Sequence, residues 1–386
     1  MSGQVSRKID RWWRGPRDHR LSVAPMMDRT DRHFRFLVRR VSRRVLLYTE
    51  MVTARAVLHG VRSRLLTFHP DEHPLSLQIG GDDPAEMAEC VRIAANWGYD
   101  EVNVNVGCPS DRVQKGRFGA CLMKEPEQVA RCVEAMRKAA DLPITVKHRI
   151  GVDDLDRYED LHHFVSVVRN AGAARFSVHA RKAWLSGLSP KQNRTVPPLR
   201  YADVVALKEA LPEECVEING GVSNLEEARA HLARVDAVMI GRAVYEDPMI
   251  LDRVDPELYG SAAPAAAGCR LGVAEAMLPY VEARLQEGHR LSSITRHMLN
   301  LFKGVAGARE YRRVLSTEGT TPGAGAEVLD RALDAIRRGR GPSESAVGSM
   351  NAPTASGQKA SNRGLETLDQ NRRRSGAVDP ERQVTP

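Results

Sequence analysis

Eight strand-like apolar runs alternate with stretches of helical spacing over about 220 residues, and this alternation allows very few folds. The runs are Leu21–Pro25, Val45–Met51, Pro74–Gly80, Glu101–Cys108, Ile144–Ile150, Ala174–Ala180, Val216–Gly221 and Ala237–Arg242. The helical stretches between them are Pro84–Trp97, Pro126–Ala140, Tyr158–Gly172, Tyr201–Leu211 and Leu225–Ala233. Eight such repeats predict an α/β fold, the parallel (β/α)8 TIM barrel. The alternative is a doubly wound sheet, which usually has a glycine-rich turn where this chain reads Ala24-Pro-Met-Met-Asp28.

The chain changes character after the last of these runs. Leu271–Gln286 and Ser292–Phe302 show helical spacing without strand alternation, which predicts a small helical domain. Residues 341–386 are rich in Ser, Gly, Ala, Asn and charge, and predict a disordered tail. The expected parts are a basic extension (1–20), the barrel (21–262), an all-helical domain (263–340) and the tail (341–386).

Composition excludes several classes of protein. The chain is 42% hydrophobic and 27% charged, and no apolar run approaches the roughly 18 residues of a membrane span. Its six cysteines include no Cys-x-x-Cys pair, which argues against a zinc site or a disulfide framework. We therefore expect a soluble cytoplasmic protein, a monomer without metal, membrane association or protein partner.

The net charge of +8 lies on the flanks of the predicted barrel. Residues 1–20 carry six basic and two acidic side chains, and residues 270–340 carry twelve and eight, whereas residues 21–269 carry 33 and 34. A polyanion such as RNA is one explanation, and improved solubility is the other.

The run Glu101–Ser110 delivers a thiol to the end of a strand. Valines alternate with Asn103 and Asn105, and Cys108 follows between a permissive glycine and a rigid proline. Buried amides need hydrogen-bond partners, so asparagines here suggest groups aimed at a ligand. A buried structural cysteine is the alternative for Cys108.

Nearly every predicted strand ends in a hydrogen-bonding group, and in such barrels these carboxyl ends carry the chemistry. Asn219-Gly220-Gly221 and Gly241-Arg242 suit a phosphate, because glycine lets backbone N–H groups approach closely. Gln78 and Lys147 could bind the polar edge of a planar ring, and Pro25-Met26-Met27 could contact its face. Together these ends predict bound FMN. Tight turns explain either glycine cluster alone, and core filling explains any one methionine.

A flavin gives Cys108 a role without metal or acyl chemistry. Reduction of a carbon–carbon double bond needs a proton as well as a hydride, and a thiol facing the flavin can act as the general acid. Gly107–Cys121 is long, glycine-rich and basic, and is expected to form a mobile lid, on which Cys121 is expected to be structural.

Two basic segments suit a large anionic substrate. The segment His179–Arg194 carries Lys191 and Arg194, and Arg309, Arg312 and Arg313 share a face if their segment is helical. Clustered with Tyr311, these arginines suit phosphates and stacked bases, and a solvated helix face is the alternative.

Several motifs together resemble the tRNA-dihydrouridine synthases, over roughly residues 20–340. They are Ala24-Pro-Met-Met-Asp-Arg-Thr-Asp-Arg-His33, Leu47-Tyr-Thr-Glu-Met51, Asn105-Val-Gly-Cys-Pro-Ser110, Lys147-His-Arg-Ile-Gly151, His179-Ala-Arg-Lys-Ala-Trp-Leu-Ser-Gly-Leu188 and Asn219-Gly-Gly221. Thr295-Arg-His-Met-Leu299 and Gly307-Ala-Arg309 point to subfamily A. Arg29 departs from the pattern, which has an aromatic residue there, and residues 341–386 have no counterpart.

The resemblance implies an FMN barrel and a helical RNA-binding domain that reduce uridines 20 and 20a in the tRNA D-loop, with NADPH or alternatively NADH as reductant. Flavin N5 would give hydride to uracil C6, and Cys108 would give the proton to C5. FMN would be held by Pro25, Met26, Met27, Gln78, Lys147, His179, Asn219, Gly220, Gly221, Gly241 and Arg242. The tRNA would be contacted by Asn105, Lys191, Arg194, Arg309 and Arg312.

Two other functions remain open from the residues themselves. An FMN barrel acting on a small molecule explains the strand ends but leaves the Arg309–Arg313 cluster without a role. An RNA-binding protein on an inactive barrel explains the charge but leaves Cys108 and the phosphate glycines unexplained.

Overall fold

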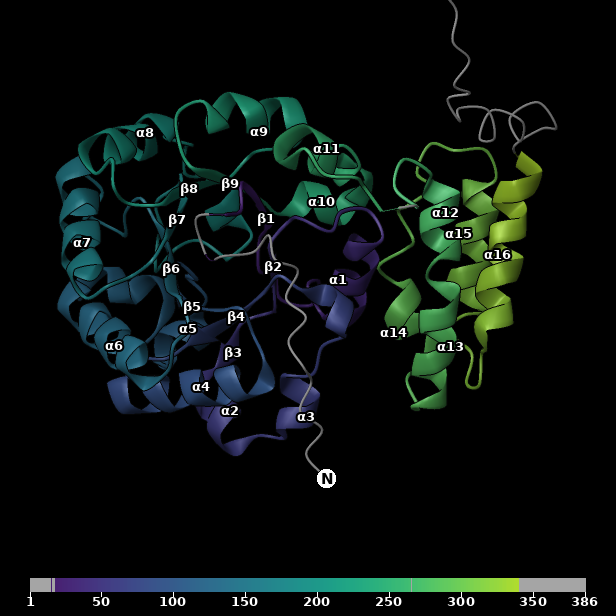
Figure 1. Ribbon diagram of the computed structural model, residues 1–386, viewed down its shortest axis with the longest axis horizontal. Helices are drawn as coiled ribbons and strands as arrows, with labels where there is room; N and C mark the ends of the chain where they lie inside the picture. The colour runs from purple at the N-terminus through teal and green to yellow at the C-terminus, as the bar shows by residue number, and fades with distance from the viewer. Residues whose placement is uncertain (1–14, 16–17, 265, 340–386) are drawn as a thin grey trace, which may run out of the picture. The chain divides into compact units, whose positions relative to one another are not determined.

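The computed structural model describes residues 15, 18–264 and 266–339 (Figure 1). The predicted tail, and most of the predicted N-terminal extension, lie outside these residues. Over the described residues one parallel sheet contains nine short strands in the order β1-β9-β8-β7-β6-β5-β4-β2, with β3 also paired to β4. They are β1 (Leu21–Val23), β2 (Leu47–Tyr48), β3 (Val52–Thr53), β4 (Leu75–Gly80), β5 (Glu101–Val106), β6 (Ile144–Arg149), β7 (Phe176–His179), β8 (Val216–Asn219) and β9 (Ala237–Ile240).

The sheet closes on itself. Leu46 bridges Ser22 in parallel, its oxygen accepting from Val23 N at 2.9 Å and its N–H donating to Leu21 O at 3.1 Å. Strand β1 therefore contacts both β9 and the start of β2, and helices surround the ring of strands (Figure 1). This confirms the predicted TIM barrel.

Helices follow the strands as the alternation predicts. In the barrel region they are α1 (Arg32–Arg39), α2 (Ala54–His59), α3 (Arg62–Leu65), α4 (Pro84–Trp97), α5 (Asp111–Lys115), α6 (Pro126–Ala139), α7 (Tyr158–Asn170), α8 (Tyr201–Ala210), α9 (Leu225–Leu232), α10 (Arg242–Glu246) and α11 (Val254–Tyr259). Short 3-10 turns are η1 (Pro70–Glu72), η2 (Gly119–Lys124), η3 (Gln192–Arg194) and η4 (Pro248–Leu251). The Asp83 carboxylate caps α4 by accepting from Glu86 N, and Asn224 caps α9 by accepting from Glu227 N.

The C-terminal region is helical, as predicted, but more broken than its periodicity suggests. It contains α12 (Arg270–Glu275), α13 (Leu278–Gln286), α14 (Leu291–Thr295), α15 (Ala308–Thr317) and α16 (Ala326–Gly339). The single helix expected over 271–286 is divided, because Pro279 lacks an N–H and is tolerated only in the first turn of α13. The helix expected over 292–302 ends at Thr295, after which bonds such as Leu301 N to Met298 O form tighter turns.

The strand expected over 45–51 was also wrong in detail. It is divided into β2 and β3, and both pair with β4. The alternation in β5 holds: Val102, Val104 and Val106 are buried in the apolar core, while the side chains of Asn103 and Asn105 bond to other polar groups of the barrel. The barrel interior is therefore polar, which positions the site.

Candidate active site

Four predicted site residues lie side by side where strands β5 to β8 end, at the barrel mouth. Asn105 is the register partner of Lys147, and His179 is the register partner of Asn219. Side-chain bonds extend the row, because Lys147 Nζ donates to Asn219 Oδ1 at 3.0 Å and Asn105 Nδ2 donates to Gln78 Oε1 at 2.9 Å. The structure thus brings together residues that are spread over 140 positions of the chain.

Cys108 is held at this mouth by Asn105. The Asn105 Oδ1 atom accepts from Gly107 N at 3.1 Å and from Cys108 N at 3.0 Å, an Asx-type turn that fixes the first residues after β5. The half-buried thiol lies 3.4 Å from Ser110 Oγ. Both polar atoms of the Asn105 side chain are therefore engaged within the protein, in three hydrogen bonds, so its structural contribution is to hold the Cys108 backbone in place.

The loop that carries Cys108 is packed in this structure rather than open. It contains α5 and η2, and Val113 and Phe118 are buried. Gly119, at φ +80°, is needed because a Cβ there would lie 2.5 Å from Cys108 O. Cys121 Sγ donates to Phe118 O, and burial raises the pKa of this thiol, in keeping with a structural role.

The glycines after β8 form a close approach of backbone to side chains. Gly220 and Gly221 have φ of +113° and +79°. A Cβ on Gly220 would lie 2.6 Å from His179 Cδ2, and one on Gly221 would lie 2.6 Å from Leu199 Cδ1. Gly241, at the start of α10, is less confined, since its Cβ would meet Met26 Sδ at 3.7 Å. Only glycine fits the first two positions, because a Cβ there would collide with these side chains.

The motif Pro25-Met26-Met27, which follows β1, lies against Gly241. Pro25 and Met26 are half-buried, whereas Met27 is 53% exposed. Core filling is therefore excluded for Met27, whose polarisable side chain is accessible from outside the core. Arg29, the departure from the family pattern, lies over the Tyr245 ring at 4.5 Å from its centre, outside the strand-end row.

Five cations gather around this row, and none of them forms a salt bridge with a carboxylate of the described residues. Among the described residues no acidic oxygen lies within 4.0 Å of any of them. They are Lys147, Arg149, Arg181, Arg194 and Arg242. Burial and the repulsion of Arg149 lower the pKa of Lys147 to about 8, and burial with the same cations holds the pKa of His179 well below its usual range. Such a cluster favours an anion.

Arg149 also lies at the mouth, although no role was predicted for it from the sequence. Its guanidinium is buried and donates to Gly107 O at 2.8 Å, Asn193 O at 3.0 Å and Lys182 O at 3.1 Å. It joins the Cys108 loop to the segment carrying Lys191 and Arg194. The available signal was its place two residues after Lys147, which puts both side chains on one face of β6.

The predicted tRNA contacts lie in two places. Lys191 and Arg194 are exposed at η3, near the mouth. On α15, Arg309 is exposed and Arg312 half-buried, while Arg313 is paired with Glu310 at 2.7 Å. The expected stacking role of Tyr311 was wrong: its ring is fully buried against Phe302, because its position on α15 faces the helical core.

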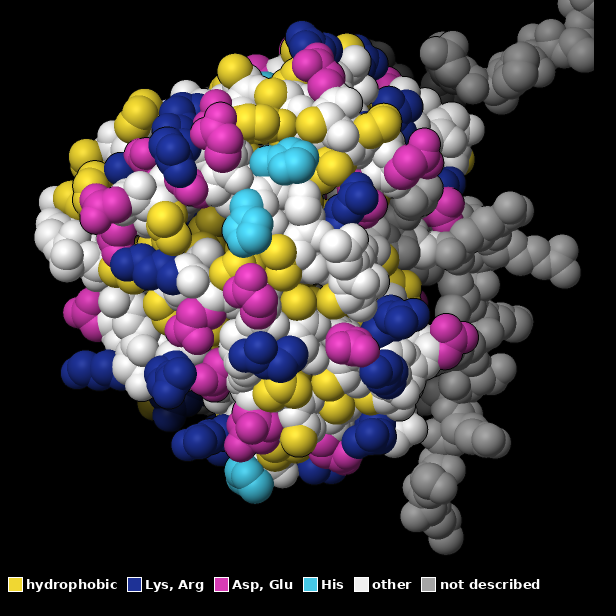
Figure 2. All heavy atoms as spheres, turned by 90° about the vertical axis from the view of Figure 1, so that its left-hand side faces the viewer, with side chains coloured by type: hydrophobic (Ala, Val, Ile, Leu, Met, Phe, Trp, Pro, Cys, Tyr) yellow, Lys and Arg dark blue, Asp and Glu magenta, His cyan; other side chains and the backbone are white. Residues whose placement is uncertain are grey.

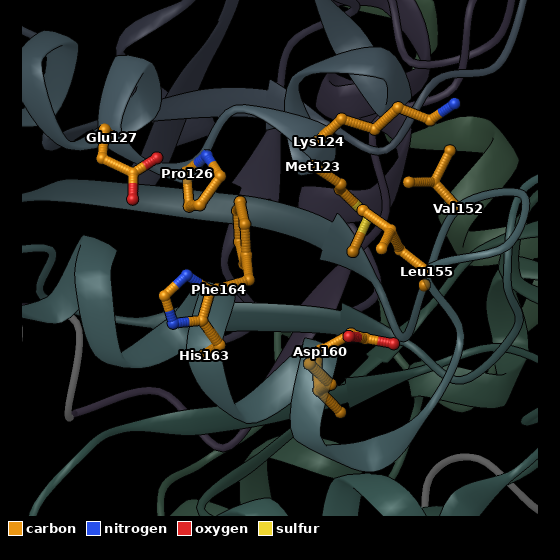
Figure 3. A pocket seen from close by; sticks show the side chains of 11 residues that line it. Met123, Lys124, Pro126, Glu127, Val152, Leu155, Asp160, His163 and Phe164 are labelled. Carbon is orange, nitrogen blue, oxygen red and sulfur yellow. The ribbon is translucent and has the colours of Figure 1, made fainter.

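A cavity of about 220 Å³ lies elsewhere, between η2, α6 and α7. Figure 3 shows Met123, Phe164 and Leu155 among its lining side chains. None of the predicted flavin or tRNA residues lines it. The described residues contain no group of three or more side chains placed to hold a metal ion, and no helix among them is long and apolar enough to cross a membrane.

Comparison with known proteins decides the family. The dihydrouridine synthase (Dus) family model matches residues 22–337. The chain belongs to this family. A tRNA-dihydrouridine(20/20a) synthase of Synechocystis sp. is 58% identical over 82% of this chain and 94% of that protein. Proteins of the same name from Shewanella oneidensis and Escherichia coli K12 are 54% and 52% identical, over 83% and 85% of this chain and 95% and 94% of their own lengths. The resemblance read from the motifs is confirmed.

Proposed function

We propose that this protein reduces uridines 20 and 20a in the D-loop of tRNA to dihydrouridine, using FMN and NADPH. The observation that carries the proposal is Cys108 held beside the unbalanced cations Lys147 and Arg149 at the barrel mouth. The name of the relatives from Synechocystis sp. and Shewanella oneidensis supplies the positions 20 and 20a. Cytoplasmic location and a monomeric state stay predictions.

The residues of the mouth fit a phosphate-bearing flavin. Gly220 and Gly221 carry no Cβ that would shield their backbone N–H groups from a phosphate, and Arg242 adds charge beside Gly241. The other residues proposed to hold FMN are Pro25, Met26, Met27, Gln78, Lys147, His179 and Asn219. When bound and reduced, FMN would supply the hydride for uracil C6. The protonated Lys147 would stabilise negative charge on the flavin ring.

The chain's own residues supply the proton and the substrate's position. The Cys108 thiol donates its proton to uracil C5, so that one hydride and one proton saturate the double bond. Asn105 keeps the thiol at the mouth through its bond to Cys108 N. Lys191 and Arg194 at the mouth, with Arg309 and Arg312 on α15, would bind tRNA phosphates while the target uridine leaves its stack.

The direct test is reduction of defined tRNA. Purified protein should show a flavin absorption spectrum, and with NADPH it should convert uridines 20 and 20a of unmodified tRNA, mapped by mass spectrometry. A tRNA with cytidine at both positions is the matched control. Colourless protein that FMN does not reconstitute, or dihydrouridine elsewhere in the D-loop, would contradict the proposal.

A further inference from the structure

Five polar side chains form a continuous line of hydrogen bonds inside the barrel. The line runs from the floor of the barrel, the end at which the strands begin, to the Cys108 loop at its mouth. In order, Asn105 Nδ2 donates to Gln78 Oε1 at 2.9 Å, Gln78 Nε2 to Asn103 Oδ1 at 2.8 Å, Asn103 Nδ2 to Thr145 Oγ1 at 2.9 Å, and Thr145 Oγ1 to Glu101 Oε1 at 2.9 Å. We call these five residues the amide relay. Gln78, Asn103, Thr145 and Glu101 are all buried.

The floor of the barrel fixes the direction of the relay. Glu101 Oε1 accepts from Arg175 Nη2 at 2.6 Å, and a carboxylate oxygen in this pair can only accept from Thr145. The Thr145 hydroxyl therefore donates its hydrogen bond to Glu101 and accepts one from Asn103. Asn103 must then turn its Nδ2 toward Thr145 and its Oδ1 toward Gln78.

The mouth fixes the same direction independently. Asn105 Oδ1 accepts from the N–H groups of Gly107 and Cys108, which can only donate. Asn105 must therefore turn its Nδ2 toward Gln78. Gln78 accepts this bond with Oε1 and thus turns its Nε2 toward Asn103. The assignments from the two ends meet at the Gln78–Asn103 bond and agree. Reversing any one amide would place donor against donor or acceptor against acceptor inside the barrel.

We propose that the amide relay sets the orientation of the Gln78 amide and the position of the Cys108 loop, so that Glu101, Asn103 and Thr145 act as positioning residues for the reaction. The flavin contact of Gln78 rests on the proposed function, whereas the hold on Cys108 does not. The relay leaves Gln78 one N–H and one lone pair, in a fixed arrangement, for a further partner. It also ties the Asn105 side chain, and with it Cys108 N, to an ion pair at the floor.

Thr145→Val tests this, because it keeps the shape of the side chain and removes the hydroxyl. Asn103 Nδ2 then loses its acceptor, so the relay is cut from the floor and only the bonds at the mouth still determine which way the amides face. Thr145→Ser restores the hydroxyl. The matched control is Ser22→Ala, which removes a hydroxyl that donates to the Glu217 carboxylate at 2.6 Å in the same interior but lies off the relay.

Two readouts separate the proposal from the proposed function. The first is the rate at which iodoacetamide alkylates Cys108 in the protein without flavin, measured by peptide mass spectrometry. The second is FMN affinity from fluorescence titration. Thr145→Val should change the alkylation rate severalfold and weaken FMN about tenfold, Thr145→Ser should recover both, and Ser22→Ala should change neither. If Thr145→Val does not fold, Thr145→Ala, which removes the same hydroxyl without placing a methyl group against Asn103 Nδ2, should give the same two changes.

The outcomes are distinguishable. Normal alkylation and normal FMN affinity in a folded Thr145→Val protein would overturn the relay, as would equal effects of Ser22→Ala. If the wild-type protein binds no FMN, the proposed function fails, and the alkylation rates alone still decide whether the relay holds the thiol.

Discussion

The floor and the mouth of the barrel both bury arginine, but the two ends balance its charge differently. At the floor, Arg175 lies 2.6 Å from Glu101 Oε1 and 3.7 Å from Glu217 Oε2. At the mouth, within the part of the chain that the structure describes, Arg149 hydrogen-bonds to carbonyl oxygens and to no carboxylate. A neutral oxygen leaves the positive field available to a ligand, whereas a carboxylate cancels it.

This difference separates structural charge from charge that serves a ligand. The outer helical face in Figure 2 follows neither pattern, since basic and acidic side chains are intermingled over it. At the floor, burial would raise the pKa of Glu217, but the hydrogen bond and charge of His19, with Arg175, lower it to about 2. The floor is therefore an internally neutralised network, and the mouth is a cationic one that an anion completes.

The largest effect should come from removing the thiol at the mouth. Cys108→Ala should lower dihydrouridine formation by about 100-fold or more, because the proton for C5 loses its donor. FMN affinity, tRNA affinity and thermal stability should stay close to wild type. Single-turnover assays with pre-reduced enzyme check this, and full turnover by the variant would remove the thiol from the mechanism.

The floor should show the opposite behaviour. Arg175→Met leaves buried Glu101 without its cation and removes one of the two cations beside buried Glu217, where His19 stays, so it should lower the free energy of unfolding by about 3–5 kcal/mol. Arg253→Met, which breaks surface pairs with Glu226 and Glu257, should cost only about 1 kcal/mol. Denaturant titration measures both. Equal costs would show that the floor network does not stabilise the barrel.

The fold was predictable because its signals are local. Alternation along β5, the Asp83 cap and the order of strands all follow from neighbouring residues, and a parallel barrel pairs mostly consecutive strands. The strand-end row was predictable for the same reason. The break before α13 also had a local signal, Pro279, but the prediction of one helix over 271–286 relied on periodicity alone.

Long-range partners were not predictable. Arg149 takes its three acceptors from two different loops, and nothing near it in the chain identifies them. The burial of Tyr311 depends on how α15 packs on Phe302, which the spacing of its arginines does not determine. The amide relay likewise depends on register between β4, β5 and β6.

Titration of Lys147 sharpens the contrast at the mouth. With its pKa lowered to about 8, Lys147 loses its charge above that pH, so FMN affinity should fall about threefold to tenfold between pH 8 and 9. The unfolded chain keeps this proton up to about pH 10.5, so the flavin-free protein should gain stability across the same range. Lys147→Arg stays charged, and its affinity should not follow this profile. A flat wild-type profile would contradict the assignment.

The smallest effect extends the comparison to the helical region, where α15 carries paired and unpaired arginines. Among the described residues Arg309 and Arg312 have no carboxylate within 4.0 Å, whereas Arg313 is paired with Glu310. The double variant Arg309→Ala with Arg312→Ala should weaken tRNA binding about fivefold to tenfold and reduce its salt dependence, while NADPH still reduces the flavin. Arg313→Ala is the matched control and should change affinity less than twofold, because Glu310 already neutralises it. If all three arginines contribute equally, the presence of a carboxylate partner does not decide which cations bind tRNA.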